Sequence, residues 1–219
     1  MMKNKLLFLF LFLSILWCLH AENTSFTFSS DTTRAVLAKG KERTVLSGNA
    51  VILSETTEIK AEKIELYGDD FRYASCTGSV SAKDSEKGIL LVCENLFYDR
   101  EDERMIVTGY GEMEDQKNEL VVKGGFFEDN GKENITIIEI GVRILKIADD
   151  QEMACRAEYA RYERDEDLLI LSGMPEVYWK DDYYSASRIT INLETDEIEL
   201  QGKVSGSVKA EEEEETESE

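Results

Sequence analysis

The chain has 219 residues and a formal net charge of −21, from 46 acidic and 25 basic side chains. This excess of acid argues against a protein that binds nucleic acid or an anionic membrane surface through charge, because both partners require Lys and Arg. Hydrophobic residues make up 42% of the sequence, which is enough to supply a core, and 14 glycines with a single proline argue against a collagen-like or Pro-rich chain.

The N-terminus is typical of a targeting segment. Lys3 and Lys5 precede an uncharged stretch over residues 6–19, whose length suits the apolar part of a signal peptide and is short for a spanning helix. We expect residues 1–21 to be a signal peptide cleaved after Ala21. Two alternatives stay open: the segment is retained as a membrane anchor, or Cys18 is lipidated, although the bulky neighbouring tryptophan disfavours lipidation.

The remainder of the chain is predicted to form one domain, residues 22–209, followed by an acidic tail. Residues 210–219 contain seven glutamates, and such a run is typical of a solvated, disordered segment.

An internal repeat organises the predicted domain. A glycine recurs after an apolar alternation, at Gly48, Gly78, Gly109, Gly173 and Gly202. The spacing is nearly constant except between Gly109 and Gly173, where it is twice as large, so a further member is expected near Gly141. There the apolar phase predicts Val142, and not Gly141, in the position of the repeat glycine.

A second signal follows each glycine by about half a repeat. It consists of a small residue, an apolar residue three positions later, another apolar or aromatic residue five positions later, and an acidic turn. Its copies are Ala61/Ile64/Leu66, Cys93/Leu96/Tyr98, Ala157/Ala160/Tyr162 and Ala186/Ile189/Ile191, with Lys123/Phe126/Glu128 as a degraded copy. Repeats of roughly 20–50 residues that cannot bury an apolar face alone are typical of stacked architectures.

Each repeat is therefore predicted to hold two short strands. The first alternates with period 2, and the spacing in the second implies a bulge or bend at a corner. Residues 154–166 have a helix-forming composition, but their place in the repeat favours a strand. The inward face is predicted to include Leu46, Gly48, Ala50 and Ile52 in one repeat, and Met105, Val107, Gly109, Gly111 and Met113 in another.

Catalytic and metal chemistry is not expected. The single histidine, His20, lies in the predicted signal peptide, so the most common general base is missing from the domain. The acidic clusters resemble solvated turns, and neither a metal site nor a cofactor is predicted. Cys76, Cys93 and Cys155 are expected to be small buried residues, with Cys76 and Cys93 as the pair that could oxidise.

The two signals together resemble the OstA/LptA family of periplasmic lipopolysaccharide-transport proteins. The resemblance rests on Leu46-Ser47-Gly48-Asn49-Ala50-Val51-Ile52 followed by Ile59-Lys60-Ala61-Glu62-Lys63-Ile64-Glu65-Leu66-Tyr67, and on Cys76-Thr77-Gly78-Ser79-Val80 followed by Val92-Cys93-Glu94-Asn95-Leu96-Phe97-Tyr98-Asp99. It runs from about residue 30 to residue 208. It implies an all-β fold, an antiparallel β-jellyroll built from about five to six of these strand–turn–strand repeats.

The resemblance also implies a function without catalysis. Members hold acyl chains of lipopolysaccharide in an apolar groove and pair through edge strands with other jellyroll proteins of a bridge between inner and outer membrane. The inward apolar residues expected to line this groove are Leu46, Ala50, Ile52, Val80, Met105, Val107, Met113, Leu171 and Val177. Small residues such as Ala50, Gly109 and Gly111 are expected to leave room for the chains.

Alternatives remain at this point. An LptC-like membrane-anchored component would keep residues 6–19, and a structural β-repeat scaffold or adhesin would have a filled core and no cargo. The negative charge also makes the domain a poor partner for lipid phosphates, so the cargo could be lipopolysaccharide or another glycolipid. Arg34, Lys39, Lys41 and Arg43 near the first repeat could offset this charge locally.

Overall fold

The computed structural model describes residues 26–148 and 151–209, so the predicted signal peptide and the acidic tail lie outside the described residues. The described chain forms sixteen strands and one short 3-10 helix. In chain order these are β1 (Thr27–Ser29), β2 (Thr32–Val36), β3 (Arg43–Leu53), β4 (Thr57–Tyr67), η1 (Asp69–Phe71), β5 (Tyr73–Asp84), β6 (Ile89–Asp99), β7 (Arg104–Asp115), β8 (Leu120–Asn130), β9 (Ile135–Ala148), β10 (Gln151–Glu163), β11 (Leu168–Ser172), β12 (Glu176–Trp179), β13 (Asp182–Ser185), β14 (Arg188–Asn192), β15 (Ile198–Gln201) and β16 (Ser205–Ser207).

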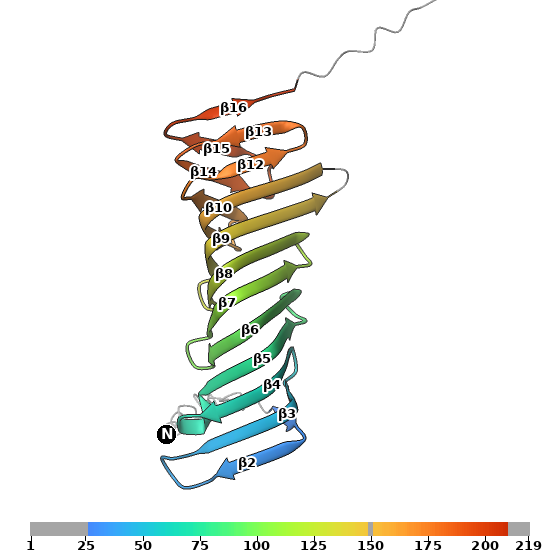
Figure 1. Cartoon of the computed structure of the whole chain (residues 1–219), viewed down its shortest axis with the longest axis vertical. Coiled ribbons are helices and arrows are strands. Elements are labelled where there is room, and N and C mark those ends of the chain that lie inside the picture. Colours follow the sequence, from blue (N-terminus) through green and yellow to red (C-terminus); the bar gives the residue numbers. More distant parts are fainter. Residues whose placement is uncertain (1–25, 149–150, 210–219) are drawn as a thin grey trace, which may run out of the picture.

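The strands form one open antiparallel sheet. From β3 to β10 each strand pairs with the next, and the sheet rises as a long twisted stack (Figure 1). At β10 the sheet divides, because β11, β14 and β15 continue one half of it while β12, β13 and β16 continue the other. At the opposite end β1 and β2 pair with the two halves of β3. The predicted all-β jellyroll class is confirmed.

The strands β3 to β10 are longer than the sequence predicted. Each has 11 to 14 residues and runs through both halves of the sheet, so a repeat is two long bent strands. The bend is a bulge, where the pairing register shifts, for example between Thr77 and Val80 against β6. A bulge kinks a strand and increases its twist, which turns one sheet into two facing walls.

Three of the repeat glycines, Gly48, Gly78 and Gly109, lie at these bulges, whereas Gly173 lies between β11 and β12 and Gly202 follows β15. All five have a positive φ, and so has Gly141. Gly78 shows why glycine is required: its φ is +78°, and a Cβ there would lie 2.5 Å from Oε2 of Glu62 on β4. A residue with a side chain would therefore meet both backbone strain and a steric clash.

The irregular repeat departs from the prediction. Ile140, with φ +68°, and Gly141, with φ +66°, form the bend of β9, while Val142 is fully buried beyond it. Ile140, and not Val142, therefore occupies the position of the repeat glycine. A β-branched residue in the left-handed region is strained.

The core fills the inside of the bend. Most predicted inward positions are buried there, including Ile64, Leu96, Ala160 and Ile189. The inward residues predicted for the degraded copy are wrong by one position. Strand β8 buries Val122, Gly124 and Phe127 and leaves Lys123 and Phe126 at least partly exposed.

Candidate binding groove

The bent sheet has two walls. Wall A consists of β1, β12, β13, β16 and the parts of the long strands next to the turns 53–57, 84–89 and 115–120. Wall B consists of β2, β11, β14, β15 and the parts next to the turns 67–73, 99–104, 130–135 and 163–168. The two rows of turns face each other along one side of the molecule, and we call the line between them the seam.

Turn chemistry keeps each row in order. Asp99, at the end of β6, is buried, and its Oδ1 accepts hydrogen bonds from the backbone N–H groups of Glu101 and Asp102 at 3.1 and 3.3 Å. Asp84 and Asp115 accept the same pair of backbone bonds in their own turns. Arg72 donates two hydrogen bonds to the Asp99 carboxylate, at 2.8 and 2.6 Å, and thereby lowers its pKa.

The nine predicted groove residues all face the inside of the bend. Seven are buried, with at most 2% of each side chain exposed: Leu46, Ala50, Val80, Val107, Met113, Leu171 and Val177. Ile52 and Met105 are partly buried and pack against this core. The nine residues extend from β3 to β12, so a continuous apolar interior runs along most of the sheet.

The small residues do not leave the space that the sequence suggested. Gly109 is exposed at a bend, and no atom lies within 4 Å of the position of its missing Cβ. Gly111 is buried, but a Cβ there would lie 3.0 Å from the ring of Phe127. The room at Gly111 is therefore taken by a side chain of the protein itself.

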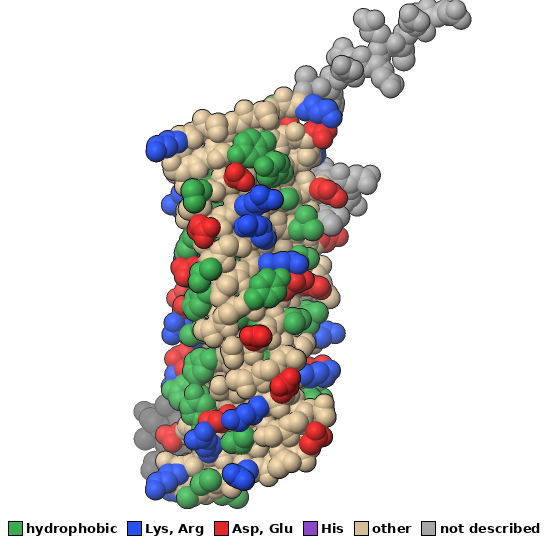
Figure 2. Space-filling view, in the orientation of Figure 1, with side chains coloured by type: hydrophobic (Ala, Val, Ile, Leu, Met, Phe, Trp, Pro, Cys, Tyr) green, Lys and Arg blue, Asp and Glu red, His purple; other side chains and the backbone are tan. Residues whose placement is uncertain are grey.

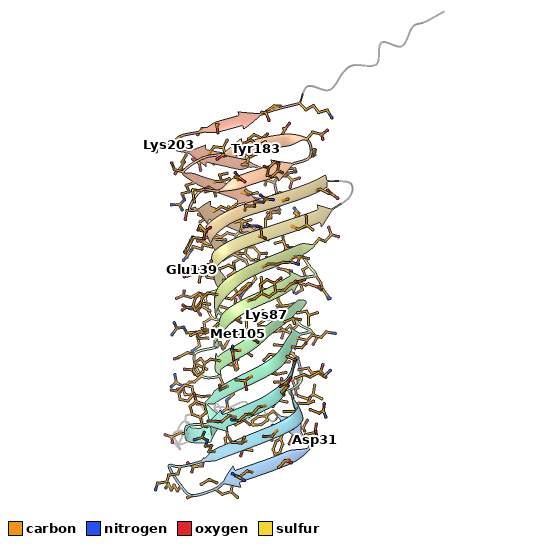
Figure 3. All side chains as sticks on the ribbon, in the orientation of Figure 1. Asp31, Lys87, Met105, Glu139, Tyr183 and Lys203 are labelled. Carbon is orange, nitrogen blue, oxygen red and sulfur yellow. The ribbon has the colours of Figure 1, made fainter. Side chains whose placement is uncertain are left out.

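A groove opens at the seam in the N-terminal half of the molecule. Its apolar lining comes from both walls: Ile59, Ala82, Ile89, Leu91 and Met113 from wall A, and Leu96, Tyr98 and Met105 from wall B. Of the nine predicted groove residues, Met105 and Met113 are in this lining. Its volume is about 120 Å³. Lys87 and Met105, at the same level of the sheet in Figure 3, both line this groove.

The polar rim of the groove contains a largely buried guanidinium, that of Arg164. Arg164, in the turn after β10, donates from Nη1 to Oδ1 of Asp129 at 2.8 Å and to Oγ1 of Thr136. Its Nη2 is buried and has no hydrogen-bond partner in the described part of the chain. Lys83, Lys87, Asp84 and Glu103 complete the charged rim.

Beyond the groove, polar side chains join the two walls. Tyr162 of wall B donates from its hydroxyl to Oδ2 of Asp115 in wall A at 3.3 Å and accepts from Nδ2 of Asn118 at 2.6 Å. Farther on, Lys146 of wall A donates to the carbonyl of Leu193 at 2.8 Å and lies 3.5 Å from Asp196. We call the Asp115–Asn118–Tyr162 group the clasp.

In the half that holds the groove, no such bond between described residues crosses the seam. Among residues 26–148 and 151–209, every hydrogen bond and ion pair that joins the two rows of turns belongs to the clasp or to Lys146. Burial and the nearby Asp115 raise the pKa of Tyr162, so its hydroxyl stays protonated and able to donate. Within the described ranges, polar bonds therefore join the two walls in the C-terminal half of the seam and not in its N-terminal half.

Sequence reasoning missed Arg164 and the clasp, because it treated acidic turns as solvated. A signal was present: Asp84, Asp99, Asp115 and Asn130 follow one another at a nearly constant spacing of half a repeat, and all four accept turn N–H groups. Asp115 is only 2% exposed.

The cysteines and the acidic residues are the further candidates for a reactive or metal-binding site. Cys76, Cys93 and Cys155 are free and buried, and burial raises their pKa to about 12, about 11 and about 12. Within the described ranges no group of His, Cys, Asp or Glu could hold a metal ion, and no helix there is long and apolar enough to cross a membrane.

The fold and groove define a class: an open, bent antiparallel sheet with an apolar interior that is accessible from one side. A family model described as "LptA/(LptD N-terminal domain) LPS transport protein" matches residues 27–197. The chain belongs to this family of lipopolysaccharide-transport proteins. Among solved structures it is similar to LptH from Pseudomonas aeruginosa, described as the LptA homologous periplasmic component of the lipopolysaccharide transport device. That similarity has 7% sequence identity and a TM-score of 0.28, and it covers 85% of this chain and 96% of that one. Among curated proteins, none matches the chain.

Proposed function

We propose that this chain is an LptA-like periplasmic carrier without enzymatic activity. It binds the acyl chains of lipopolysaccharide or a related glycolipid between walls A and B and relays the lipid from the inner to the outer membrane. The observation that carries the proposal is the apolar interior that opens at the seam in the N-terminal half, where no hydrogen bond or ion pair of the described residues joins the two walls.

The energetics favour acyl chains as cargo. Each buried methylene contributes about 0.8 kcal/mol, so several chains bind without specific polar contacts. The groove of about 120 Å³ is too small for a whole chain, so the walls must separate. No hydrogen bond or ion pair between described residues joins the two walls beside this groove. Moving the walls apart there therefore loses apolar contacts but breaks no polar bond between them.

The rim of the groove suits a polar headgroup. Arg164 Nη2 is a buried donor without a described partner, and a buried donor is stabilised when a ligand oxygen accepts its hydrogen bond. The basic residues expected to serve this purpose, Arg34, Lys39, Lys41 and Arg43, are exposed at the far N-terminal end. Arg43 already pairs with Glu65 at 2.7 Å. Arg164 is therefore the better candidate for contact with a phosphate or a sugar hydroxyl.

The ends of the sheet suit other jellyroll proteins of the bridge as partners. The edge strands β1, β2 and β16 are exposed along their whole lengths, and Asp31 beside β2 and Lys203 before β16 lie at opposite ends of the molecule (Figure 3). Open edges invite strand addition from another chain. We propose that these edges join neighbouring carriers, or further copies of this chain, in one continuous sheet.

The test is site-specific photo-crosslinking in living cells. A photoreactive residue at Met105, which lines the groove, is expected to give lipid-bearing adducts. One at Thr108, which is exposed on the same strand, is not. Met105 is a better site than Val107, because Val107 is fully buried and a bulky probe would disrupt the core. An exported, folded protein without lipid adducts at Met105 would contradict the carrier function.

Two other functions, an LptC-like membrane component and a scaffold without cargo, are distinguished from the carrier by experiment. An LptC-like component would keep residues 6–19 and stay in the membrane fraction after carbonate extraction, whereas a cleaved carrier is released with the periplasm. A scaffold without cargo would give no lipid adduct at any groove position.

A further inference from the structure

A ladder of basic side chains crosses the outer face of wall A. Lys123 on β8 pairs in register with Arg143 on β9, and Arg143 pairs with Arg156 on β10. Like charges directly opposite each other destabilise a sheet, and here they occur in a chain of net charge −21. Figure 2 shows these Lys and Arg side chains gathered over β8, β9 and β10.

Among the described residues, two of the three charges lack an acidic partner. Lys123 lies 2.9 Å from Glu112, whereas neither Arg143 nor Arg156 forms an ion pair with any described residue. Glu176 lies in register with Arg156, but no salt bridge joins them. Arg143 donates from Nη1 to the backbone carbonyl of Val142 at 2.8 Å, which leaves its charge unpaired, so both exposed guanidinium groups remain available to an anionic ligand.

An apolar row runs beside the basic ladder. The row lies two residues away from the basic ladder along each strand. Its outward residues, each in register with the next, are Val121, Leu145, Ala154, Tyr178 and Tyr183. Leu145 is 38% exposed and Tyr178 is 44% exposed, and Tyr178 and Tyr183 pack with ring centroids 5.0 Å apart. The small Ala154 leaves a hollow of about 310 Å³ between the two rows, lined by Lys123, Arg143, Leu145, Arg156 and Tyr178.

The acidic segment of the same chain has the charge and the reach to cover this face. Residues 211–219 contain seven glutamates, and they follow β16, which joins β10 through β13 and β12. Three strand spacings of ~4.8 Å and about four residues along the strands give a span of roughly 20 Å from residue 209 to Arg156. Ten residues reach at most about 33 Å when extended, so the glutamates can reach both arginines.

We infer that residues 211–219 dock on the outer face of wall A, with their carboxylates on Arg143 and Arg156 and their backbone over the hollow at Ala154. The docking neutralises the like-charge ladder and covers the exposed apolar row. The segment begins directly after the edge strand β16 and crosses β13 and β12 to reach β10, so a protein that pairs with that edge also meets the start of the docked segment.

The test uses the chain from residue 22 to residue 219 with a nitroxide on Ser218→Cys. The three native thiols are buried, so labelling is directed to position 218. In a ¹⁵N-labelled sample at low salt, the nitroxide is expected to weaken the backbone amide signals of Arg143 and Arg156. At 1 M NaCl, where the Debye length is about 3 Å, these signals are expected to recover.

A charge-reversed variant and a matched control separate docking from general attraction. Arg143→Glu with Arg156→Glu is expected to abolish the signal loss. Arg34→Glu with Arg188→Glu changes the net charge equally at exposed positions elsewhere and is expected to preserve it. Signal loss that persists in the first variant, or that is absent from the unmodified chain, would overturn the inference.

Mixing resolves whether the contact lies within one chain. A ¹⁵N-labelled chain without nitroxide, mixed with a spin-labelled chain at natural isotope abundance, is expected to show no signal loss at Arg143. Loss in the mixed sample equal to that in the single chain would assign the contact to a second copy and overturn docking within the chain. The result does not depend on lipid binding, so it is distinguishable from failure of the carrier function.

Discussion

The clasp gives a quantitative test of how the two walls are joined. Asp115 accepts from the backbone N–H groups of Lys117 and Asn118, both at 3.1 Å, from Nδ2 of Asn118 at 3.0 Å and from the Tyr162 hydroxyl at 3.3 Å. At about 1 kcal/mol for each hydrogen bond, Asp115→Ala is expected to lower the free energy of unfolding by about 3–4 kcal/mol. Tyr162→Phe removes the bonds to Asp115 and Asn118 without leaving a large cavity, and is expected to cost about 2 kcal/mol.

The double variant isolates the bond that crosses the seam. Because Asp115 and Tyr162 share one hydrogen bond, the effects of the two substitutions are expected to be less than additive by about 1 kcal/mol. Unfolding in urea at pH 7, followed by far-UV circular dichroism, gives the three free-energy changes. Asp84 is the matched control, since it accepts turn N–H groups from Glu86 and Lys87 and makes no bond to Tyr162. Asp84→Ala with Tyr162→Phe is expected to be additive, and a coupling as large as that of Asp115 would refute the clasp.

Three further predictions concern charge, strain and thiols. The pKa of Asp99 is lowered by Arg72, so this carboxylate stabilises the fold above its unfolded pKa of about 3.9. That stabilisation is lost as the pH falls through the lower pKa of Asp99 in the folded protein. In thermal melts from pH 7 to pH 2, the Asp99→Asn variant is expected to be less stable than the unmodified chain at neutral pH, and its stability is expected to fall less in acid. Ile140→Asn, which suits the positive φ of that position, is expected to raise the free energy of unfolding by about 1 kcal/mol; an equal or lower value in urea titration would show that Ile140 is not strained. In the chain from residue 22 onward, Cys76, Cys93 and Cys155 are expected to react with a disulfide reagent only after unfolding, because burial raises their pKa; rapid reaction of the native protein would contradict this.

The repeat and the inward face could be predicted without any structure. The first strand of each repeat turns its corner through a left-handed backbone, and glycine is the residue that adopts this conformation without strain. The period-2 alternation then places Leu46, Val107 and Leu171 inside, and all three are fully buried. These features are local in the chain, so they can be recognised without knowledge of distant contacts.

The contacts across the seam, in contrast, became visible only in the folded sheet. The clasp joins Asp115 to Tyr162, 47 positions apart, and no local pattern marks two such residues as partners. Gly111 appeared to leave room for cargo, but Phe127 on the neighbouring strand fills that space. The basic ladder is likewise invisible in the chain, because Lys123, Arg143 and Arg156 become neighbours only through strand register. Contacts across walls and strands depend on how the sheet bends and pairs as a whole, which is why the position of the groove could not be read from the repeat alone.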